Sequence, residues 1–166
     1  ASRGSVIPLF HQQILNGGPV TITTEDMTRF LLPLEKAVDT IFEALRNGGP
    51  GETYVPKVTS ARISDVATAL IGKRPIKKLI TGIRPGEKIH EILVSEEESF
   101  RTEDRGDYLA INPMLPELIG DIKVSSFLNR EYSSRDNVMS LDEVHQLLMA
   151  NHLMLEDVGG EGETFQ

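Results

Sequence analysis

The stretch Arg84-Pro85-Gly86-Glu87 combines a cation and an anion on one tight turn. Its guanidinium group could grip a diphosphate, since planar bidentate donors suit phosphate oxygens. Its carboxylate could accept hydrogen bonds from ribose hydroxyls. An ordinary turn closed by a capping glutamate explains the same four residues, and without further context that simpler interpretation is favoured.

Two other basic positions could contribute to the same ligand. The stretch 2–5 (Ser-Arg-Gly-Ser) precedes a predicted helix, where backbone N–H groups, a hydroxyl and a guanidinium would suit a phosphate or a uracil edge. A frayed chain end is the equally good alternative. Arg29 has apolar neighbours and therefore needs an anionic partner or a route to water. A solvated arginine or a salt bridge to Glu25 or Asp26 is the favoured simpler explanation. Together the three positions suggest a site in which arginines bind a diphosphate and a glutamate accepts hydrogen bonds from a ribose.

The elements that must position these residues follow from the spacing of apolar side chains. It predicts a helix over 6–15, a strand over 19–23, and a second strand over 27–31 that returns with Arg29 near its middle. A helix beginning after Pro33 is expected to bury one apolar face. That face comprises Leu34, Ala37, Val38, Ile41, Phe42 and Leu45.

Further along the chain, strands and helices continue to alternate. Strands are predicted over 53–55, 75–80 and 108–111, and a capping box at Ser140 and Glu143 begins a helix. A helix capped by Ser64 is expected to bury Val66, Ala67, Leu70 and Ile71. A short helix after the Pro-Gly turn should show the apolar face Ile89, Ile92 and Leu93. This alternation indicates a mixed α/β fold.

Composition excludes several classes of function. The net charge of −8 disfavours a general binder of nucleic acid or anionic membranes. The chain has no cysteine, hence neither a disulfide nor a thiolate metal site, and its four histidines are far apart in sequence, so no metal site is expected. Apolar runs are too short to span a bilayer, and no signal-peptide pattern opens the chain, which favours a cytoplasmic location. The chain begins without Met, as a cut piece would.

The common catalytic and cofactor motifs are absent from the sequence. It contains no G-x-G-x-x-G, no G-x-x-x-x-G-K-[ST] and no H-E-x-x-H. None of the three tyrosines is followed four residues later by lysine. We therefore predict no catalytic residue and no cofactor-binding residue in this chain.

Several stretches resemble a known family. SRGSVIPLF at 2–10, GGPVTIT at 17–23, DMTRF at 26–30 and GIRPGEKIHEIL at 82–93 are similar, in that order, to the carboxy-terminal part of the bacterial polysaccharide-biosynthesis branch of extended short-chain dehydrogenases. That branch includes UDP-N-acetylglucosamine 4,6-dehydratases and capsular-polysaccharide epimerase-like enzymes. EYSSRDNVMSLDEVHQLL at 131–148 resembles the small C-terminal extension of some members.

The resemblance implies a substrate domain whose Rossmann half is absent from this chain. It implies that NAD or NADP binds to that missing N-terminal domain, which becomes a partner, and that the full-length form is a homo-oligomer. It implies that Arg29 and Arg84 contact the diphosphate of a UDP-sugar and that Glu87 holds the ribose. The residues implied to lie at the nucleotide are Arg3, Gly4 and Ser5.

The expected organisation is a substrate-binding domain over 1–113, an extension with a capped helix over 114–155, and a disordered tail over 156–166. The expected function is UDP-sugar binding within a 4,6-dehydratase, with UDP-N-acetylglucosamine as substrate, in capsule, O-antigen or surface polysaccharide synthesis. A 4-epimerase of the same family, a non-catalytic binding module, and an unrelated α/β domain remain alternatives. The chain alone is expected to be inactive, with an exposed interdomain face near Val6, Ile7 and Phe30.

Overall fold

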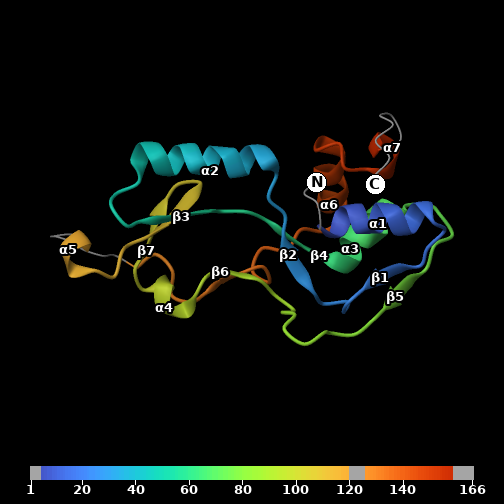
Figure 1. Cartoon of the computed structure of the whole chain (residues 1–166), viewed down its shortest axis with the longest axis horizontal. Helices are drawn as coiled ribbons and strands as arrows, with labels where there is room; N and C mark the ends of the chain where they lie inside the picture. The colour runs from blue at the N-terminus through green and yellow to red at the C-terminus, as the bar shows by residue number, and fades with distance from the viewer. Residues whose placement is uncertain (1–4, 120–125, 159–166) are drawn as a thin grey trace. The chain divides into compact units, whose positions relative to one another are not determined.

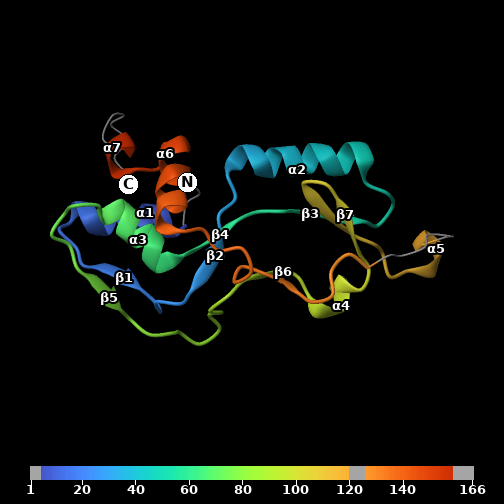
Figure 2. The same cartoon turned by 180° about the vertical axis from the view of Figure 1, so that it is seen from behind.

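The computed structural model describes residues 5–119 and 126–158 of the chain. The fold is mixed α/β with several small sheets (Figures 1 and 2). Its helices are α1 (Val6–Leu15), α2 (Leu34–Asn47), α3 (Ile63–Ile71), α4 (Glu96–Ser99), α5 (Pro116–Ile119), α6 (Leu141–Ala150) and α7 (Leu155–Val158). Its strands are β1 (Val20–Ile22), β2 (Thr28–Phe30), β3 (Thr53–Pro56), β4 (Ser60–Arg62), β5 (Lys78–Ile80), β6 (Ile92–Val94), β7 (Thr102–Arg105), β8 (Tyr108–Ile111) and β9 (Tyr132–Ser133).

Two compact units are interleaved along the sequence. Within the described residues, unit 1 comprises 5–29, 61–89 and 138–158, and unit 2 comprises 30–60, 90–119 and 126–137. The region expected as a C-terminal extension therefore contributes to both units. The boundary at residue 113 itself stays a prediction about the sequence family.

Unit 1 is built around helix α3. This helix contacts α1, α6 and β1, and β1 pairs in parallel with β5. Its predicted buried face is confirmed, and Val66, Ala67 and Leu70 are all fully buried. The chain leaves α1 through Gly17 and Gly18, where only glycine fits: the φ of Gly18 is +80°, and an added Cβ would lie 2.7 Å from the Cγ2 of Ile76.

Unit 2 has an antiparallel three-stranded sheet in the order β3-β8-β7. Strands β6 and β9 form a second, two-stranded antiparallel sheet. A small apolar core consists of Val55, Val94, Leu109 and Ile111. Helix α2 packs along β3, the edge strand of the larger sheet.

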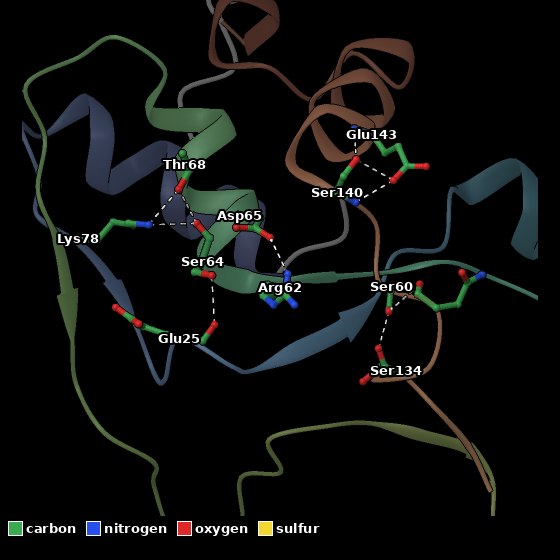
Figure 3. A network of polar contacts seen from close by, with 11 residues as sticks. Glu25, Ser60, Arg62, Ser64, Asp65, Thr68, Lys78, Ser134, Ser140 and Glu143 are labelled. Carbon is green, nitrogen blue, oxygen red and sulfur yellow. Dashed lines mark hydrogen bonds and ion pairs between the residues drawn. The ribbon is translucent and has the colours of Figure 1, made fainter. Parts of the chain in front are cut away.

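Two helix predictions are confirmed closely. The helix predicted over 6–15 is α1, and the capping box at the start of α6 is complete. In that box, the Ser140 N–H donates to Oε2 of Glu143 at 2.8 Å, and the Glu143 N–H donates to Oγ of Ser140 at 3.4 Å (Figure 3).

Three local predictions are wrong, each because of a distant partner. The strand predicted over 27–31 is present as β2 with Arg29 at its middle, but it does not return beside β1, which instead pairs with β5 far along the chain. The predicted helix with the face Ile89, Ile92 and Leu93 is absent from the described chain, because residues 92–94 extend to pair with β9 as strand β6. Ser64 does not cap α3: the N-cap is Arg62, and the Ser64 hydroxyl donates to the Glu25 carbonyl at 3.1 Å.

The largest correction concerns burial. Helix α2 exists where predicted, but none of its residues is buried. The expected interdomain face also differs, because Ile7 is buried and Phe30 is half-buried, with its ring centroid 5.2 Å from that of Tyr132. The expected disordered tail begins within α7, and its residues 159–166 lie outside the described part of the chain.

Candidate functional site

The Arg84–Glu87 turn in unit 1 is closed by two reciprocal hydrogen bonds. The Glu87 N–H donates to the Arg84 carbonyl at 3.0 Å, and the Arg84 N–H donates to Oε2 of Glu87 at 2.9 Å. Pro85 and Gly86 occupy its central positions, and the φ of +85° at Gly86 is typical of a type II turn. The capping role considered for Glu87 is therefore present, and it leaves Arg84 exposed on a constrained backbone.

Arg29 lies at the end of this turn. Its Nη1 donates to the Thr28 carbonyl at 2.7 Å and to the Ile89 carbonyl at 3.1 Å, and its Nη2 donates to the Lys88 carbonyl at 2.8 Å. The Thr28 N–H donates to the same Ile89 carbonyl at 3.0 Å. A strand arginine and the turn that carries Arg84 are thus joined within unit 1.

The exposed Arg84 side chain can present positive charge beside a rigid turn. The bonds to the carbonyls of residues 88 and 89 orient the Arg29 guanidinium. Arg84 is held at its backbone by Glu87 while its side chain faces solvent. Convergence of both guanidinium groups on one anion stays a prediction.

Ser5 is the N-cap residue of α1. Its backbone is extended, and its side chain makes no capping hydrogen bond. Its Oγ is buried, and within the part of the chain that the structure describes it has no hydrogen-bond partner. Arg3 and Gly4, the other two residues assigned to this end, lie outside the described residues.

A polar network in unit 1 was not anticipated from the sequence. Nζ of Lys78 lies 2.9 Å from the Thr68 hydroxyl, to which it donates, and 3.5 Å from the Ser64 carbonyl (Figure 3). An open hollow of about 430 Å³ lies here, lined by Glu25, Asp26, Arg62, Ser64 and Lys78. These residues come from separate segments, so no local motif marks them.

A larger open hollow of about 820 Å³ adjoins the end of α3. On its wall, Arg74 forms a 2.5 Å ion pair with Glu156 and caps the α3 carbonyls of Leu70 and Ile71. In the same unit, Nε2 of the buried His11 lies 2.9 Å from the Leu153 carbonyl, and burial lowers the pKa of His11.

Two kinds of structural feature are absent from the described residues. Within residues 5–119 and 126–158, no helix is long and apolar enough to cross a membrane. In the same ranges, no group of three or more histidine, aspartate or glutamate residues is arranged to hold a metal ion.

Several proteins similar to this chain are named as nucleotide-sugar enzymes. The chain is 39% identical over 159 residues to a UDP-glucose 4-epimerase of Rickettsia bellii, covering 90% of this chain and 46% of the relative. It is 37% identical over 169 residues to the UDP-glucose 4-epimerase of Rickettsia canadensis, covering 95% and 49%. An uncharacterized membrane protein of Methanocaldococcus jannaschii is 37% identical, over 78% of this chain and 44% of the relative. The chain thus spans about half the length of the curated relatives it matches.

The crystal structure of Pen from Bacillus thuringiensis superposes with a TM-score of 0.80 at 30% identity, over 92% of this chain and 48% of Pen. The profile of the Polysaccharide biosynthesis protein family matches residues 1–113, about two-thirds of the chain. The chain therefore belongs to the polysaccharide biosynthesis protein family, as the resemblance in its sequence indicated.

Proposed function

We propose that this chain is the UDP-sugar-binding part of a nucleotide-sugar epimerase or dehydratase that acts in surface polysaccharide synthesis. The observation that carries the proposal is the junction of Arg29 with the Arg84–Glu87 turn. Arg84 is part of this constrained turn, and Arg29, from a separate strand, donates to the carbonyls of Lys88 and Ile89 just after it. A nucleoside diphosphate, with two charged phosphates and a ribose, has the chemistry that such a loop can recognise.

Within this class, the relatives' names favour a UDP-sugar 4-epimerase over the 4,6-dehydratase that the sequence resemblance put first. The substrates of both reactions carry the same UDP moiety, so the proposed binding residues serve either reaction. The residues that separate epimerisation from loss of water belong to the part of such enzymes that this chain does not match. The identity of the sugar attached to UDP is accordingly the more specific part of the proposal.

Both reactions begin with oxidation at C4 of the sugar, for which bound NAD or NADP supplies the hydride acceptor. The sequence has neither the glycine-rich dinucleotide loop nor the Tyr-xxx-Lys pair. We therefore assign no catalytic step to its residues. Their proposed work is to bind and orient: Arg84 and Arg29 toward the diphosphate, Glu87 toward the ribose, and Ser5 with Arg3 and Gly4 toward the base end of the nucleotide.

Substitution of Arg84 tests the site with the least disturbance to the loop. It is exposed, whereas Arg29 holds three backbone carbonyls and its loss would disturb the loop itself. Arg84→Ala should weaken UDP binding to the 166-residue chain by about 1.5–3 kcal/mol, the scale of hydrogen bonds to charged groups. Arg84→Lys should restore only part of the affinity, because a point charge cannot replace a planar fork. Isothermal titration calorimetry with UDP measures both.

Arg62→Ala is the matched control for this titration. Arg62 lies in the same unit, pairs with Asp65 at 3.6 Å, and lines the separate hollow at Lys78. Its loss should leave UDP affinity unchanged. Equal affinities of Arg84→Ala and the unmodified chain, or a loss confined to Arg62→Ala, would reject the Arg84 loop as the nucleotide site. A non-catalytic binding module would show the same binding without turnover when joined to a cofactor-binding half.

A further inference from the structure

The positive charges of this acidic chain are concentrated in one stretch, which we call the basic segment, residues 72–90. It contains six basic residues and a single acidic one, Glu87, whereas the other 147 residues include eleven basic and twenty-four acidic residues. The segment thus carries a formal charge of +5 against −13 for the rest of the chain. Its basic residues are Lys73, Arg74, Lys77, Lys78, Arg84 and Lys88.

The basic segment includes β5 and the Arg84–Glu87 turn of unit 1. Strand β5 lies beside β1 in both views and pairs with it, and all three residues of β5 are exposed (Figures 1 and 2). The Val20 N–H donates to the Lys77 carbonyl at 3.0 Å, and the Thr81 N–H donates to the Ile22 carbonyl at 2.9 Å. The backbone is therefore held on both sides of β5, while its side chains face solvent just before the turn.

The cations of the segment differ in the partners that they have. Arg74 is already ion-paired at the end of α3, and Lys78 extends to α3, where it donates to the Thr68 hydroxyl (Figure 3). Lys77 and Lys88 are exposed, and within the described residues neither of them forms an ion pair. These two lysines therefore contribute positive charge that no neighbouring carboxylate cancels.

Lys77 and Lys88 flank Arg84 within the range of electrostatic forces at low salt. Lys77 precedes Arg84 by seven residues and Lys88 follows it by four, so their Cα atoms lie within about 25 Å and about 14 Å of that of Arg84. The screening length is about 30 Å at 0.01 M ionic strength and about 8 Å at 0.15 M. Fixed charges around a site raise the local concentration of ligands of opposite charge and speed their association.

We propose that Lys77 and Lys88 attract the anionic diphosphate of a nucleotide toward the Arg84 loop from a distance, without holding it once it is bound. This inference rests on the proposed function, since it takes the ligand of Arg84 to be a nucleoside diphosphate. The rest of the chain, with its charge of −13, repels such a ligand, and the basic segment counteracts that repulsion where the ligand must arrive. Arg84 then governs how long the nucleotide stays, and the two lysines govern how often it arrives.

The test compares Lys77→Gln/Lys88→Gln with the control Arg46→Gln/Arg135→Gln, which removes two exposed positive charges from unit 2. NMR line shapes of the ¹⁵N-labelled 166-residue chain, titrated with UDP, give kon and koff separately and show whether each variant is folded. At 0.01 M ionic strength, the lysine variant should lower kon by about threefold to tenfold and leave koff unchanged. At 0.15 M its effect on kon should fall below about twofold, and the control should stay below about twofold at both ionic strengths.

Arg84→Ala separates this inference from the proposed function, because it should raise koff at both ionic strengths. If the lysine variant raises koff, the two lysines hold the bound nucleotide and the proposal is overturned. An unchanged kon at 0.01 M, or an equal loss in the control, would also overturn it while leaving the Arg84 site intact. Failure of UDP to bind the unmodified chain would instead reject the proposed function, and this inference with it.

Discussion

Helices α2 and α3 have similar amphipathic patterns in the sequence but differ in burial in the structure. Seven of the nine residues of α3 are buried, whereas none of the fourteen residues of α2 is. α3 has its cover within unit 1, in α1, α6 and β1. The main contact of α2 is with β3, and Lys36 of α2 also lies over the Tyr108 ring of β8, 5.1 Å from its centroid. Periodicity therefore identifies which face of a helix is apolar, but it does not say whether that face is buried.

Truncating one leucine on each helix should reveal the difference between the two helices most strongly. Leu70 in α3 is fully buried and Leu45 in α2 is 76% exposed. Leu70→Ala should lower the free energy of unfolding by about 2–5 kcal/mol through lost burial and the remaining cavity. Leu45→Ala should change it by less than about 0.5 kcal/mol, as expected for an exposed site. Urea denaturation of the 166-residue chain measures both.

Comparable losses for the two leucine variants would show that α2 is buried in solution. The contrast between the two helices would then fail.

A smaller effect should come from His11, which anchors α1 in the same unit as α3. Burial lowers the pKa of His11 below its usual value of 6.5, although its hydrogen bond with the Leu153 carbonyl acts in the other direction. The unfolded chain therefore takes up a proton more readily than the folded one. Stability should be insensitive to this group above about pH 6.5 and should fall as the pH drops from there toward the lower folded pKa.

His11→Gln removes that proton uptake and keeps a side chain that can hydrogen-bond. Its free energy of unfolding should decrease less than that of the unmodified chain between about pH 7.5 and about pH 5.5. Urea titrations at the two pH values measure the difference. Equal acid sensitivity of the two proteins would mean that His11 does not couple folding to protonation.

Local signals in the sequence predicted local structure well. The limits of α1 follow from its apolar spacing and from the Asn16-Gly17-Gly18 stop, and the start of α6 follows from its capping box. The tight turn at Arg84–Glu87 could be predicted for the same reason, because Pro85 and Gly86 specify it without contacts from distant segments.

Contacts between distant segments could not be predicted in this way. Strand β1 pairs with β5, and residues 92–94 become a strand because β9 reaches them, although their local pattern resembles a helix. The bonds from Arg29 to residues 88 and 89 likewise depend on tertiary structure. The sequence therefore indicated Arg29 and Arg84 as candidates, while the structure alone shows how Arg29 meets the residues after the turn.

The most direct test of the central claim, UDP binding by unit 1 at the Arg84 loop, is hydrogen–deuterium exchange of the 166-residue chain with and without UDP. We expect slower exchange on UDP addition in peptides covering 28–30 and 82–90, and unchanged exchange in 34–47, the span of α2. Slower exchange in α2, or none at the Arg84 loop under saturating UDP, would contradict it.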